Sequence, residues 1–463
     1  MKKLIFAHSS ICFTISCSFA QTTYCKWFGG NGLDNATSFA KTPDTGIIIT
    51  GYTNSYGAGQ YDIILLKLDR NGNLLWAKTI GGQYGEEGYS IKSDNQGNYL
   101  VAGGTASFGQ GSHEDYVIKL TSQGTISYAK TYGFPGHEHI YDCIRLISDK
   151  IICTGHTSSF GHGGDDVDLL ITDASGNIIT EKAIGSSMDD VGFRIFPVGN
   201  GKTGIAGYTF SCSQFSHALF LITDDTGGVL LSVCAGGPQE DYFWDGILAS
   251  DNHIYLAGST NSYGSGGYDM LILKMDTSGN IIWSKAFGTN QSEEAFSITQ
   301  MDSNTLLVGG YTNYNGPNNE DILLMAISTS GNLLWARTIG GPMNDRAQKI
   351  DISQDSSIIC AGYSHSYSTQ NPDIYIIKLK KDGTFSDTCS CLSQMINLSV
   401  NDAPLTVNTG WASIATSTPI MSSGGIEQNI GDTLHNICLS FPQYTNSIPS
   451  VQSFETVSYT HLR

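Results

Sequence analysis

Basic residues are scarce in this chain of 463 residues, in which 24 lysines and arginines stand against 42 aspartates and glutamates and give a formal net charge of −18. A surface of this sign repels phosphate backbones and anionic lipid headgroups, so we expect no nucleic acid and no membrane surface among its partners. Long apolar runs are also missing after the N-terminus, and none approaches the roughly 20 residues that span a bilayer. The composition therefore predicts no membrane insertion and favours cations or basic partners.

Catalytic motifs are absent as well. The sequence contains no G-x-S-x-G, no H-E-x-x-H and no P-loop pattern. Acidic residues are numerous enough to supply a pair for glycoside hydrolysis, but spacing in the sequence does not place two carboxyls at the required separation. These absences favour a binding protein over an enzyme, assign no catalytic residue and identify no cofactor.

The first 20 residues have the features of a signal peptide. Two lysines precede a mostly apolar stretch, and residues 18–20 (Ser-Phe-Ala) have the small-x-small form of a signal-peptidase site. The alternative is a lipoprotein acylated at Cys17, but Thr14 stands where such signals usually carry leucine. We therefore expect the mature chain to begin at Gln21 and to be secreted, extracellular or displayed at the cell surface.

A repeat of about 52 residues fills most of the chain. Within residues 88–133 four phrases (GYSIKSD, GNYLVAGGT, DYVIKLTS and GTISYAKTYG) mix β-branched and aromatic residues between turn residues, and each phrase predicts a strand. Asn71-Gly72 and Ser278-Gly279 provide the positive φ that a tight turn between the third and fourth phrases needs. Seven glycines that close the fourth phrase stand 51 or 52 residues apart: Gly29, Gly81, Gly133, Gly185, Gly236, Gly288 and Gly340. Four antiparallel strands per unit predict an all-β fold, a seven-bladed β-propeller of four-stranded blades over residues 21–391.

The seventh unit lacks its fourth strand. Residues 384–387 show no counterpart of the Trp-Ala-Lys phrase, whereas residues 24–28 (YCKWF) align with residues 76–80 (WAKTI). We therefore expect the N-terminal strand to complete blade seven and close the ring, which leaves only short protected edges.

The cysteines suggest covalent closure at the same place. Eleven are present, and nine (11 − 2) remain once the two in the signal peptide are removed, so an oxidising compartment would leave at least one unpaired within the chain. Ring closure would bring Cys25 near Cys389 and Cys391, so a disulfide to one of them is geometrically reasonable, and the other could reach Cys438. The alternative is that residues 384–389 form their own strand and Cys25 stays reduced.

The repeated phrases resemble those of secreted bacterial and archaeal β-propeller repeat proteins, which carry WAKTIGG, GNYLVAGGT and D-x-x-x-x-KL units. The matching phrases are LLWAKTIGG (74–82), NYLVAGGT (98–105), DIILLKLDRNGN (62–73) and LLWARTIGG (333–341). The resemblance covers residues 24 to about 388 and implies the propeller fold, but no particular activity, because this architecture hosts unrelated functions. Blade four departs most, with Ala218 where other units place an acid.

Acidic residues recur in two sets of loops on one face of the predicted ring. The first set is Asp34, Glu86, Asp190, Asp241, Glu293 and Asp345, and the second is Asp62, Glu114, Asp166, Asp269, Asp321 and Asp373. A ring of carboxylates could collect calcium. Residues that recur in nearly every blade are more simply explained as carboxylates that accept backbone N–H groups in tight loops, so we interpret both sets as structural.

Histidines mark blade three as the place where the repeat is broken. His137 and His139 lie in one of its loops and His156 and His162 in another, and His139 stands in for the repeat's acid. The fold should bring these loops together, and imidazoles backed by carboxylates suit zinc, copper or nickel. We predict a divalent metal site at these four residues, with solvated loop residues as the alternative.

The last part of the chain departs from the repeat. Residues 392–456 are rich in Ser, Thr, Asn and Pro, with strand-like pieces at 398–400 and 405–407, and we expect a linker or a small β appendage. Residues 457–463 (VSYTHLR) resemble a translated sequencing adapter.

Three functions stay open on these grounds. A rigid ring with variable loops and no catalytic motif favours a secreted or cell-surface, monomeric, non-enzymatic binding or adhesion module for a protein or glycan ligand. An extracellular enzyme acting on polysaccharide, or a metal-dependent activity at blade three, is the first alternative. A purely structural surface protein is the second.

Overall fold

The computed structural model describes residues 22–436 apart from 95, 110–111, 317–318, 369–370, 387–392, 411, 418–419, 424–425 and 431–434. The predicted signal peptide and the predicted adapter residues lie outside this part of the chain. The described residues form no helix, and hence no helix long and apolar enough to cross a membrane.

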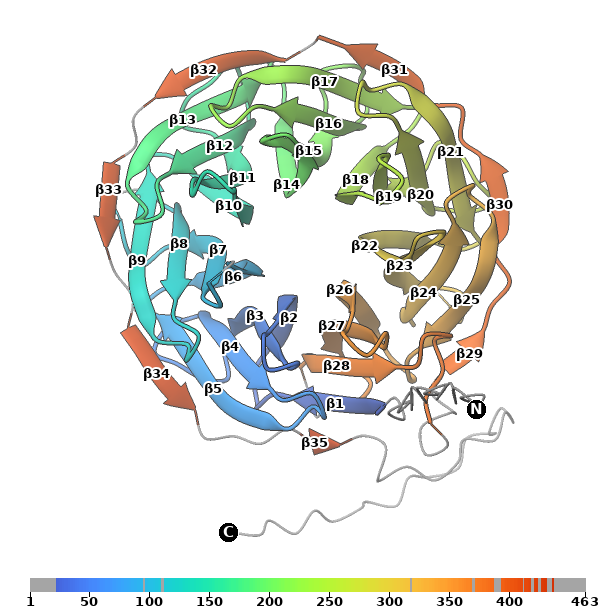
Figure 1. Ribbon diagram of the computed structural model, residues 1–463, viewed down its shortest axis with the longest axis horizontal. Coiled ribbons are helices and arrows are strands. Elements are labelled where there is room, and N and C mark those ends of the chain that lie inside the picture. Colours follow the sequence, from blue (N-terminus) through green and yellow to red (C-terminus); the bar gives the residue numbers. More distant parts are fainter. Residues whose placement is uncertain are drawn as a thin grey trace, which may run out of the picture.

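Seven antiparallel sheets stand around a central axis, and the predicted seven-bladed all-β propeller is confirmed (Figure 1). Blades one to three contain β2 (Asp34–Lys41), β3 (Ile47–Thr53), β4 (Asp62–Leu68), β5 (Leu74–Gly81); β6 (Glu86–Ser93), β7 (Tyr99–Thr105), β8 (Glu114–Leu120), β9 (Ile126–Gly133); and β10 (Glu138–Arg145), β11 (Ile151–Thr157), β12 (Asp166–Thr172), β13 (Ile178–Gly185). Blades four to six contain β14 (Asp190–Gly199), β15 (Lys202–Thr209), β16 (His217–Thr223), β17 (Val229–Gly236); β18 (Asp241–Leu248), β19 (Ile254–Thr260), β20 (Asp269–Met275), β21 (Ile281–Gly288); and β22 (Glu293–Asp302), β23 (Thr305–Thr312), β24 (Asp321–Ser328), β25 (Leu333–Ile339). Blade seven contains β26 (Asp345–Ile352), β27 (Ile358–Ser364), β28 (Asp373–Leu379) and β1 (Tyr24–Phe28).

The N-terminal strand closes the ring as predicted. β1 pairs antiparallel with β28 over five residue pairs, from Tyr24 opposite Lys378 to Phe28 opposite Ile374. Phe28 is fully buried, and it packs in a cluster that joins blade seven to blade one. Hydrogen bonds and packing therefore hold the two ends of the ring together.

The disulfide expected from Cys25 is not formed. Cys25 is a free, fully buried cysteine, and its thiol donates to the hydroxyl of Tyr375 at 2.9 Å. Cys389, Cys391 and Cys438 lie outside the described residues. The described residues do contain a disulfide in blade four, Cys212–Cys234, which was not predicted.

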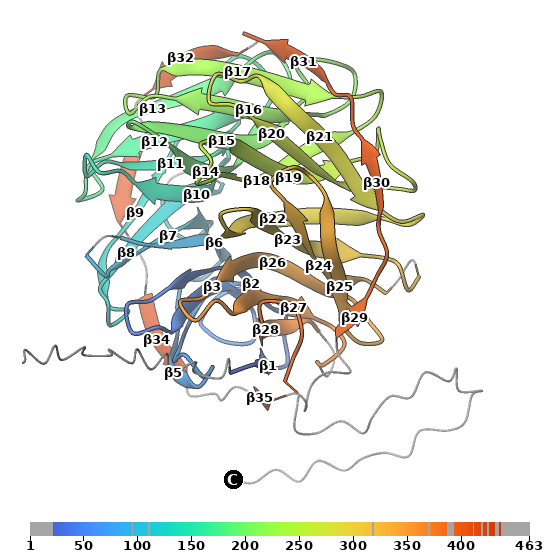
Figure 2. The same cartoon turned by 45° about the vertical axis from the view of Figure 1, so that its right-hand side comes forward.

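Each blade has a fifth strand that the sequence did not predict, contributed by the C-terminal segment. This segment runs backwards around the ring and lies antiparallel on the outermost strand of every blade in turn, from blade six to blade seven (Figures 1 and 2). Its strands are β29 (Ser393–Met395), β30 (Ser399–Asp402), β31 (Thr406–Thr409), β32 (Ser413–Ser417), β33 (Ile420–Ser423), β34 (Ile426–Ile430) and β35 (His435–Asn436). We call it the belt. The segment expected to be a linker or small β appendage is thus spread over all seven blades.

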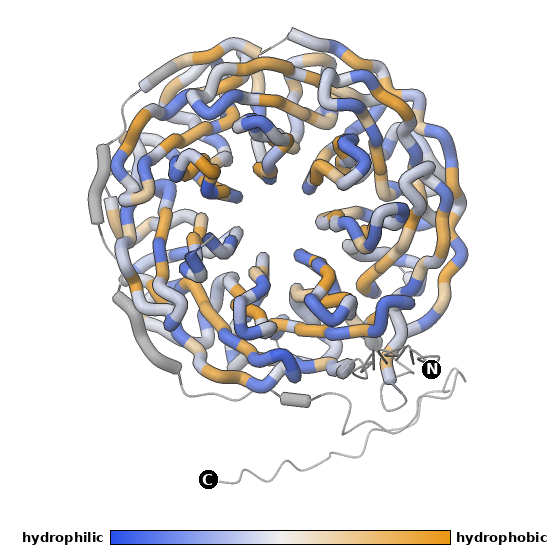
Figure 3. The backbone as a smooth tube through the Cα atoms, in the orientation of Figure 1, coloured by the Kyte–Doolittle hydropathy of each residue, from blue (hydrophilic) through white to orange (hydrophobic). Residues whose placement is uncertain are grey.

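The hydrophobic core is divided among the gaps between neighbouring blades, and apolar stretches run through the strands around the whole ring (Figure 3). Parts of the belt enter this core between its strands. Ile396 and Leu398 pack between blades five and six, and Ala403 and Leu405 pack between blades four and five. The belt therefore contributes packing as well as edge hydrogen bonds.

Candidate functional site

Every blade carries a β-bulge at the same place in its innermost strand. In blade one, for example, the pairing between β2 and β3 shifts between Ala36 and Ser38, so Thr37 is left without a cross-strand partner. The bulged residues of blades one to seven are Thr37, Tyr89, Tyr141, Phe193, Trp244, Phe296 and Gln348. All seven line one cavity of about 270 Å³ in the central channel.

The bulged residues divide this cavity into an aromatic and a polar sector. Ring centroids lie 5.2 Å apart between Tyr89 and Tyr141, 5.4 Å between Tyr141 and Phe193, 4.4 Å between Phe193 and Trp244, and 5.6 Å between Trp244 and Phe296. These five rings form a continuous arc over blades two to six, which we call the aromatic arc. Thr37, Gln348, Asn35 and Tyr52 complete the wall at blades one and seven.

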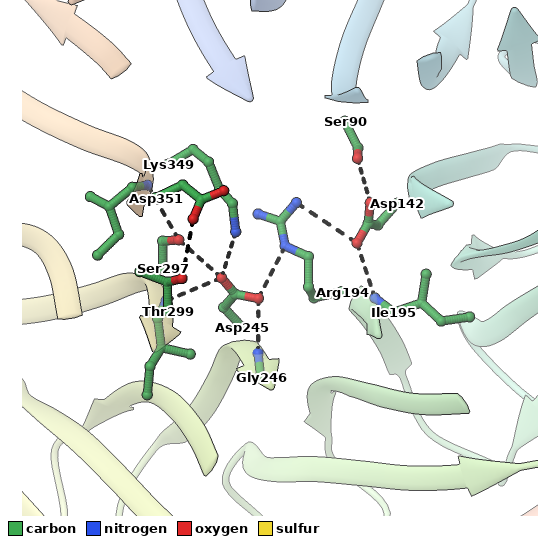
Figure 4. A network of polar contacts seen from close by, with 12 residues as sticks. Ser90, Asp142, Arg194, Ile195, Asp245, Gly246, Ser297, Thr299, Lys349 and Asp351 are labelled. Carbon is green, nitrogen blue, oxygen red and sulfur yellow. Dashed lines mark hydrogen bonds and ion pairs between the residues drawn. The ribbon is translucent and has the colours of Figure 1, made fainter. Parts of the chain in front are cut away.

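A layer of charged and hydroxyl side chains lies next to the aromatic arc, because the residue after each bulge is polar (Figure 4). Asp245, in blade five, accepts from Lys349 Nζ of blade seven at 2.9 Å and from Ser297 Oγ of blade six at 3.0 Å. Asp142 accepts from the backbone N–H of Ile195 at 3.2 Å and from Ser90 Oγ. These contacts join the innermost strands of successive blades.

Burial and charge act in opposite directions on this layer. Asp245 is fully buried, but the positive charges of Lys349 and Arg194 hold its pKa at about 2, so it is ionised. Burial lowers the pKa of Lys349, and the carboxylate of Asp245 opposes that shift. With Lys92 3.2 Å from Asp142, three cationic side chains face two carboxylates. These five side chains therefore carry a net positive charge, in a protein of net charge −18.

Arg194 is the charged side chain of this layer that also lines the cavity. Its guanidinium lies 3.7 Å from Asp245 and 4.0 Å from Asp142, both longer than a hydrogen bond. Among the described residues its Nε has no hydrogen-bond partner, although it is buried. The two ion pairs therefore orient the guanidinium of Arg194 without forming hydrogen bonds to its N–H groups.

Histidines gather on the face above blades two and three. The ligand nitrogens of His113, His137 and His139 all lie within 4.8 Å of one another. The rings of His113 and His139 stack at 4.0 Å, and the ring of His156 lies 5.6 Å from both His137 and His139. We call these four residues the histidine cluster.

The structure brings together three of the four histidines predicted from the sequence. His162 is not a member of the close group, and its backbone N–H donates to Asp166 at 2.8 Å. His113, from the blade-two loop before β8, takes part instead, and sequence reasoning missed it. The signal was present, because His113 immediately precedes Glu114, the acid of the second recurring set.

Two members of the histidine cluster, His113 and His139, are neutral near pH 7. Burial, together with the other imidazoles, lowers the pKa of His139 to about 2, and burial lowers that of His113 to about 4. Nδ1 of His139 and of His156 is buried and has no hydrogen-bond partner among the described residues. Neutral imidazoles with open lone pairs are the form in which histidine binds transition metals.

The recurring acids are structural, as interpreted from the sequence. Asp34 accepts from the backbone N–H of Gly30 at 2.8 Å, and Asp241 and Asp345 accept the equivalent N–H groups at 2.8 Å. In blade three this position belongs to Glu138, which accepts from Phe134 N–H at 3.0 Å. The expectation that His139 replaces the repeat's acid is therefore wrong by one residue.

Blade four also differs from its expected register. β16 begins at His217, which pairs with Thr209 as Asp62 pairs with Thr53 in blade one. His217, and not Ala218, therefore occupies the position of the acid. Its Nδ1 lies 3.5 Å from Sγ of Cys234, so the substitution accompanies the disulfide of this blade.

These features define a seven-bladed β-propeller repeat protein with an aromatic central cavity. The family described as a domain of unknown function (DUF5122) beta-propeller matches residues 43–74. Regulatory protein FlaEY of Caulobacter vibrioides is 23% identical over 244 residues, which are 46% of this chain and 25% of that protein, so the match spans about a quarter of the relative.

Solved structures resemble the chain in fold. Sqt1 from Chaetomium thermophilum has 10% identity and a TM-score of 0.42 over 78% of this chain and 100% of its own. Puromycin hydrolase has 11% identity and a TM-score of 0.42 over 71% and 50%. The soluble aldose sugar dehydrogenase from Escherichia coli has 10% identity and a TM-score of 0.32 over 78% and 100%.

Proposed function

We propose that this chain is a secreted or cell-surface, non-enzymatic binding module that holds the end of a glycan in its central cavity. The observation that carries the proposal is the aromatic arc, whose five rings stand at the same bulge in five successive blades and line one cavity. Aromatic faces stack against the C–H faces of a sugar, and a few polar groups then fix its orientation. Asn35, Gln348 and Arg194 supply those polar groups in the same wall.

The charge of the channel selects among glycans. Arg194 and its neighbours make the cavity locally cationic, so a sugar that carries a carboxylate is favoured over a neutral one. A peptide that ends in an aromatic residue would use the same arc but would not need the polar sector. The two ligands are separated by experiment.

A glycan array followed by calorimetry tests the proposal. We expect binding to acidic oligosaccharides, and we expect Trp244→Ala and Phe193→Ala to weaken it by at least ~10-fold, because stacked rings dominate such contacts. Leu75→Ala, which changes an exposed side chain of β5, is the control and should bind as the parent does. Failure to bind any glycan, or binding that both aromatic variants leave unchanged, refutes the proposal. Release of new reducing ends from a bound polysaccharide refutes its non-enzymatic part.

A second function, favoured by the histidine cluster, is binding of a divalent transition metal. We propose that His113, His137 and His139 hold zinc, copper or nickel, with His156 beside them. The neutral state of His113 and His139, and the spacing of all three residues within 4.8 Å, support this assignment.

Calorimetric titration of zinc into metal-stripped protein is the test. We expect saturable binding tighter than about 10 μM that is lost in His139→Ala. His162→Ala should bind zinc as the parent does, since His162 lies outside the close group. Equal loss in both variants, or no saturable binding in the parent, excludes the assignment.

A further inference from the structure

Three carboxyl groups meet inside the protein between blades two and three. Asp115 comes from β8, Asp168 from β12 and Glu181 from β13, and one oxygen from each lies within 4.8 Å of the others. All three residues are fully buried. Among the described residues no side chain outside the group donates a hydrogen bond to their six carboxyl oxygens, although the backbone N–H of Leu169 interacts with Asp168. We call this group the buried triad.

The repeat itself shows that the fold does not require acids here. The residues at the position of Asp115 in the other blades are Ile63, Val167, Ala218, Met270, Ile322 and Ile374. Those at the position of Asp168 are Ile64, Tyr116, Leu219, Leu271, Leu323 and Tyr375, and those at the position of Glu181 are Ala77, Ala129, Ser232, Ser284, Ala336 and Cys25. Carboxylates thus replace apolar, aromatic or small residues at three positions, and these three converge on one point.

In the part of the chain that the structure describes, no positive charge compensates the buried triad. Val117 and Leu170, each two residues beyond a triad aspartate, pack in the hydrophobic cluster between the two blades. The groups that act electrostatically on Asp115 are Asp168, Glu181 and Glu138, all of them acidic. Three ionised carboxylates cannot stay unpaired in such a place, because the cost of burying even one is several kcal/mol.

We propose that the buried triad is a binding site for one hard divalent cation, with calcium as the best match, that links blade two to blade three. The donors are oxygen only, which selects calcium, magnesium or manganese over zinc and copper. With each carboxylate bound through both of its oxygens, the triad would supply six ligands, the lower limit for calcium, whereas magnesium usually keeps several waters for which a dry interior has no place. A bound cation would neutralise the charge of the three carboxylates. The other blades have no such charge, because apolar, aromatic or small residues stand at these positions.

Metal analysis of the full secreted chain tests the site. Protein prepared in calcium and freed of loose ions should retain one calcium per chain, and EDTA should lower its melting temperature by about 5 °C or more, since an ion that binds the folded state stabilises it. The matched variant is Asp115→Ile, Asp168→Ile and Glu181→Ala combined, which installs the residues of blade one. It should fold, retain no calcium and melt at a temperature that EDTA does not change.

Two single substitutions test the charge and the location of the site. Asp168→Asn keeps the shape of the site but removes one charge. It should retain less calcium than the parent, and in EDTA it should melt no lower than the parent does in EDTA. His139→Ala should keep its calcium, which separates this site from the histidine cluster. A parent that holds no calcium or manganese, and whose melting temperature ignores EDTA, shows that the triad shares protons only and overturns the proposal.

Discussion

Gly104 decides whether the histidine cluster can exist. The residues at its position in strand two of blades one to seven are Tyr52, Gly104, His156, Tyr208, Ser259, Tyr311 and Tyr363. A Cβ added to Gly104 would lie 2.1 Å from Cε1 of His113. The space that the imidazole occupies is therefore the space that a side chain fills in the other blades.

Gly104→Ala should abolish the cluster without unfolding the blade. The methyl group would push away a side chain that can rotate, and backbone φ at this position does not require glycine. We expect zinc affinity to fall at least ~10-fold while the melting temperature changes by no more than a few degrees. Calorimetry and thermal melting measure the two quantities. Unchanged zinc affinity would show that His113 is not a ligand.

Single positions were where sequence reasoning was least accurate. Glu138 and His139 are neighbours in the sequence. The position of the recurring acid was assigned to His139, whereas Glu138 occupies it and accepts the backbone N–H of the loop. The fixed offset of five residues from Gly133 to Glu138, as from Gly81 to Glu86, identifies the right residue. The buried triad gave no such signal, because its members are far apart in sequence and only the packing of two blades unites them.

At the scale of the strand, β1 is the element whose removal tests ring closure most directly. A chain lacking residues 22–30 loses the burial of Phe28 and Cys25 and exposes the edge of β28. We expect a melting temperature at least ~5 °C lower and self-association through the free edge. Thermal melting and light scattering test this, and a deletion variant that melts and elutes like the parent contradicts it.

The buried acids of strands β20 and β24 predict a pH dependence of stability. Burial, with a neighbouring carboxylate, raises the pKa of Asp269 and of Asp321 from 3.8 to about 7. The folded protein therefore binds more protons than the unfolded chain between about pH 4 and pH 7, so the free energy of unfolding falls as pH rises through that window. Asp269→Asn should reduce the difference between pH 5 and pH 8 by about 2 kcal/mol, measured by denaturant titration. An unaltered difference contradicts the prediction.

The strands themselves were predictable, but the bulges were not. Turn residues and β-branched phrases indicate four strands per repeat and an orphan strand at the N-terminus. A bulge adds one residue and moves every later side chain to the other face, and the letters Gly88, Tyr89 and Ser90 look the same with or without it. The aromatic arc was therefore hidden, although its residues recur at a spacing of 51 or 52.

For the whole molecule, the belt predicts a difference between a full chain and one that ends at Ser386. Truncation uncovers the outer edge of every blade and removes Ile396, Leu398 and Leu405 from the core, at ~1–2 kcal/mol for each side chain. We expect the ring to stay folded, because its blades keep four strands, but to melt lower and to associate through its edges. Light scattering and thermal melting decide. A truncated chain that stays monomeric and equally stable contradicts the prediction.

The belt escaped prediction because its strands are short, from two to five residues, and because β29, β30 and β31 contain no buried residue. Strand patterns rely on one buried face, which these three strands lack. A weaker signal lies between them, where Ile396 and Leu398 are followed seven residues later by Ala403 and Leu405. The belt therefore advances by one blade about every seven residues, whereas the blades themselves repeat about every 52 residues.

The order of the belt also determines how the molecule bears a mechanical load. A pull on the chain at Asn436 acts first on β35, which is held by two residue pairs to β1. Only when it yields does tension reach β34 on blade one, and the release then passes through blades two, three, four and five to β29 on blade six. Each step breaks the pairing of one belt strand and frees a few residues, while the four strands of each blade keep their own pairing. The belt strands should therefore detach from the ring one after another under load, and each detachment should absorb a small amount of work.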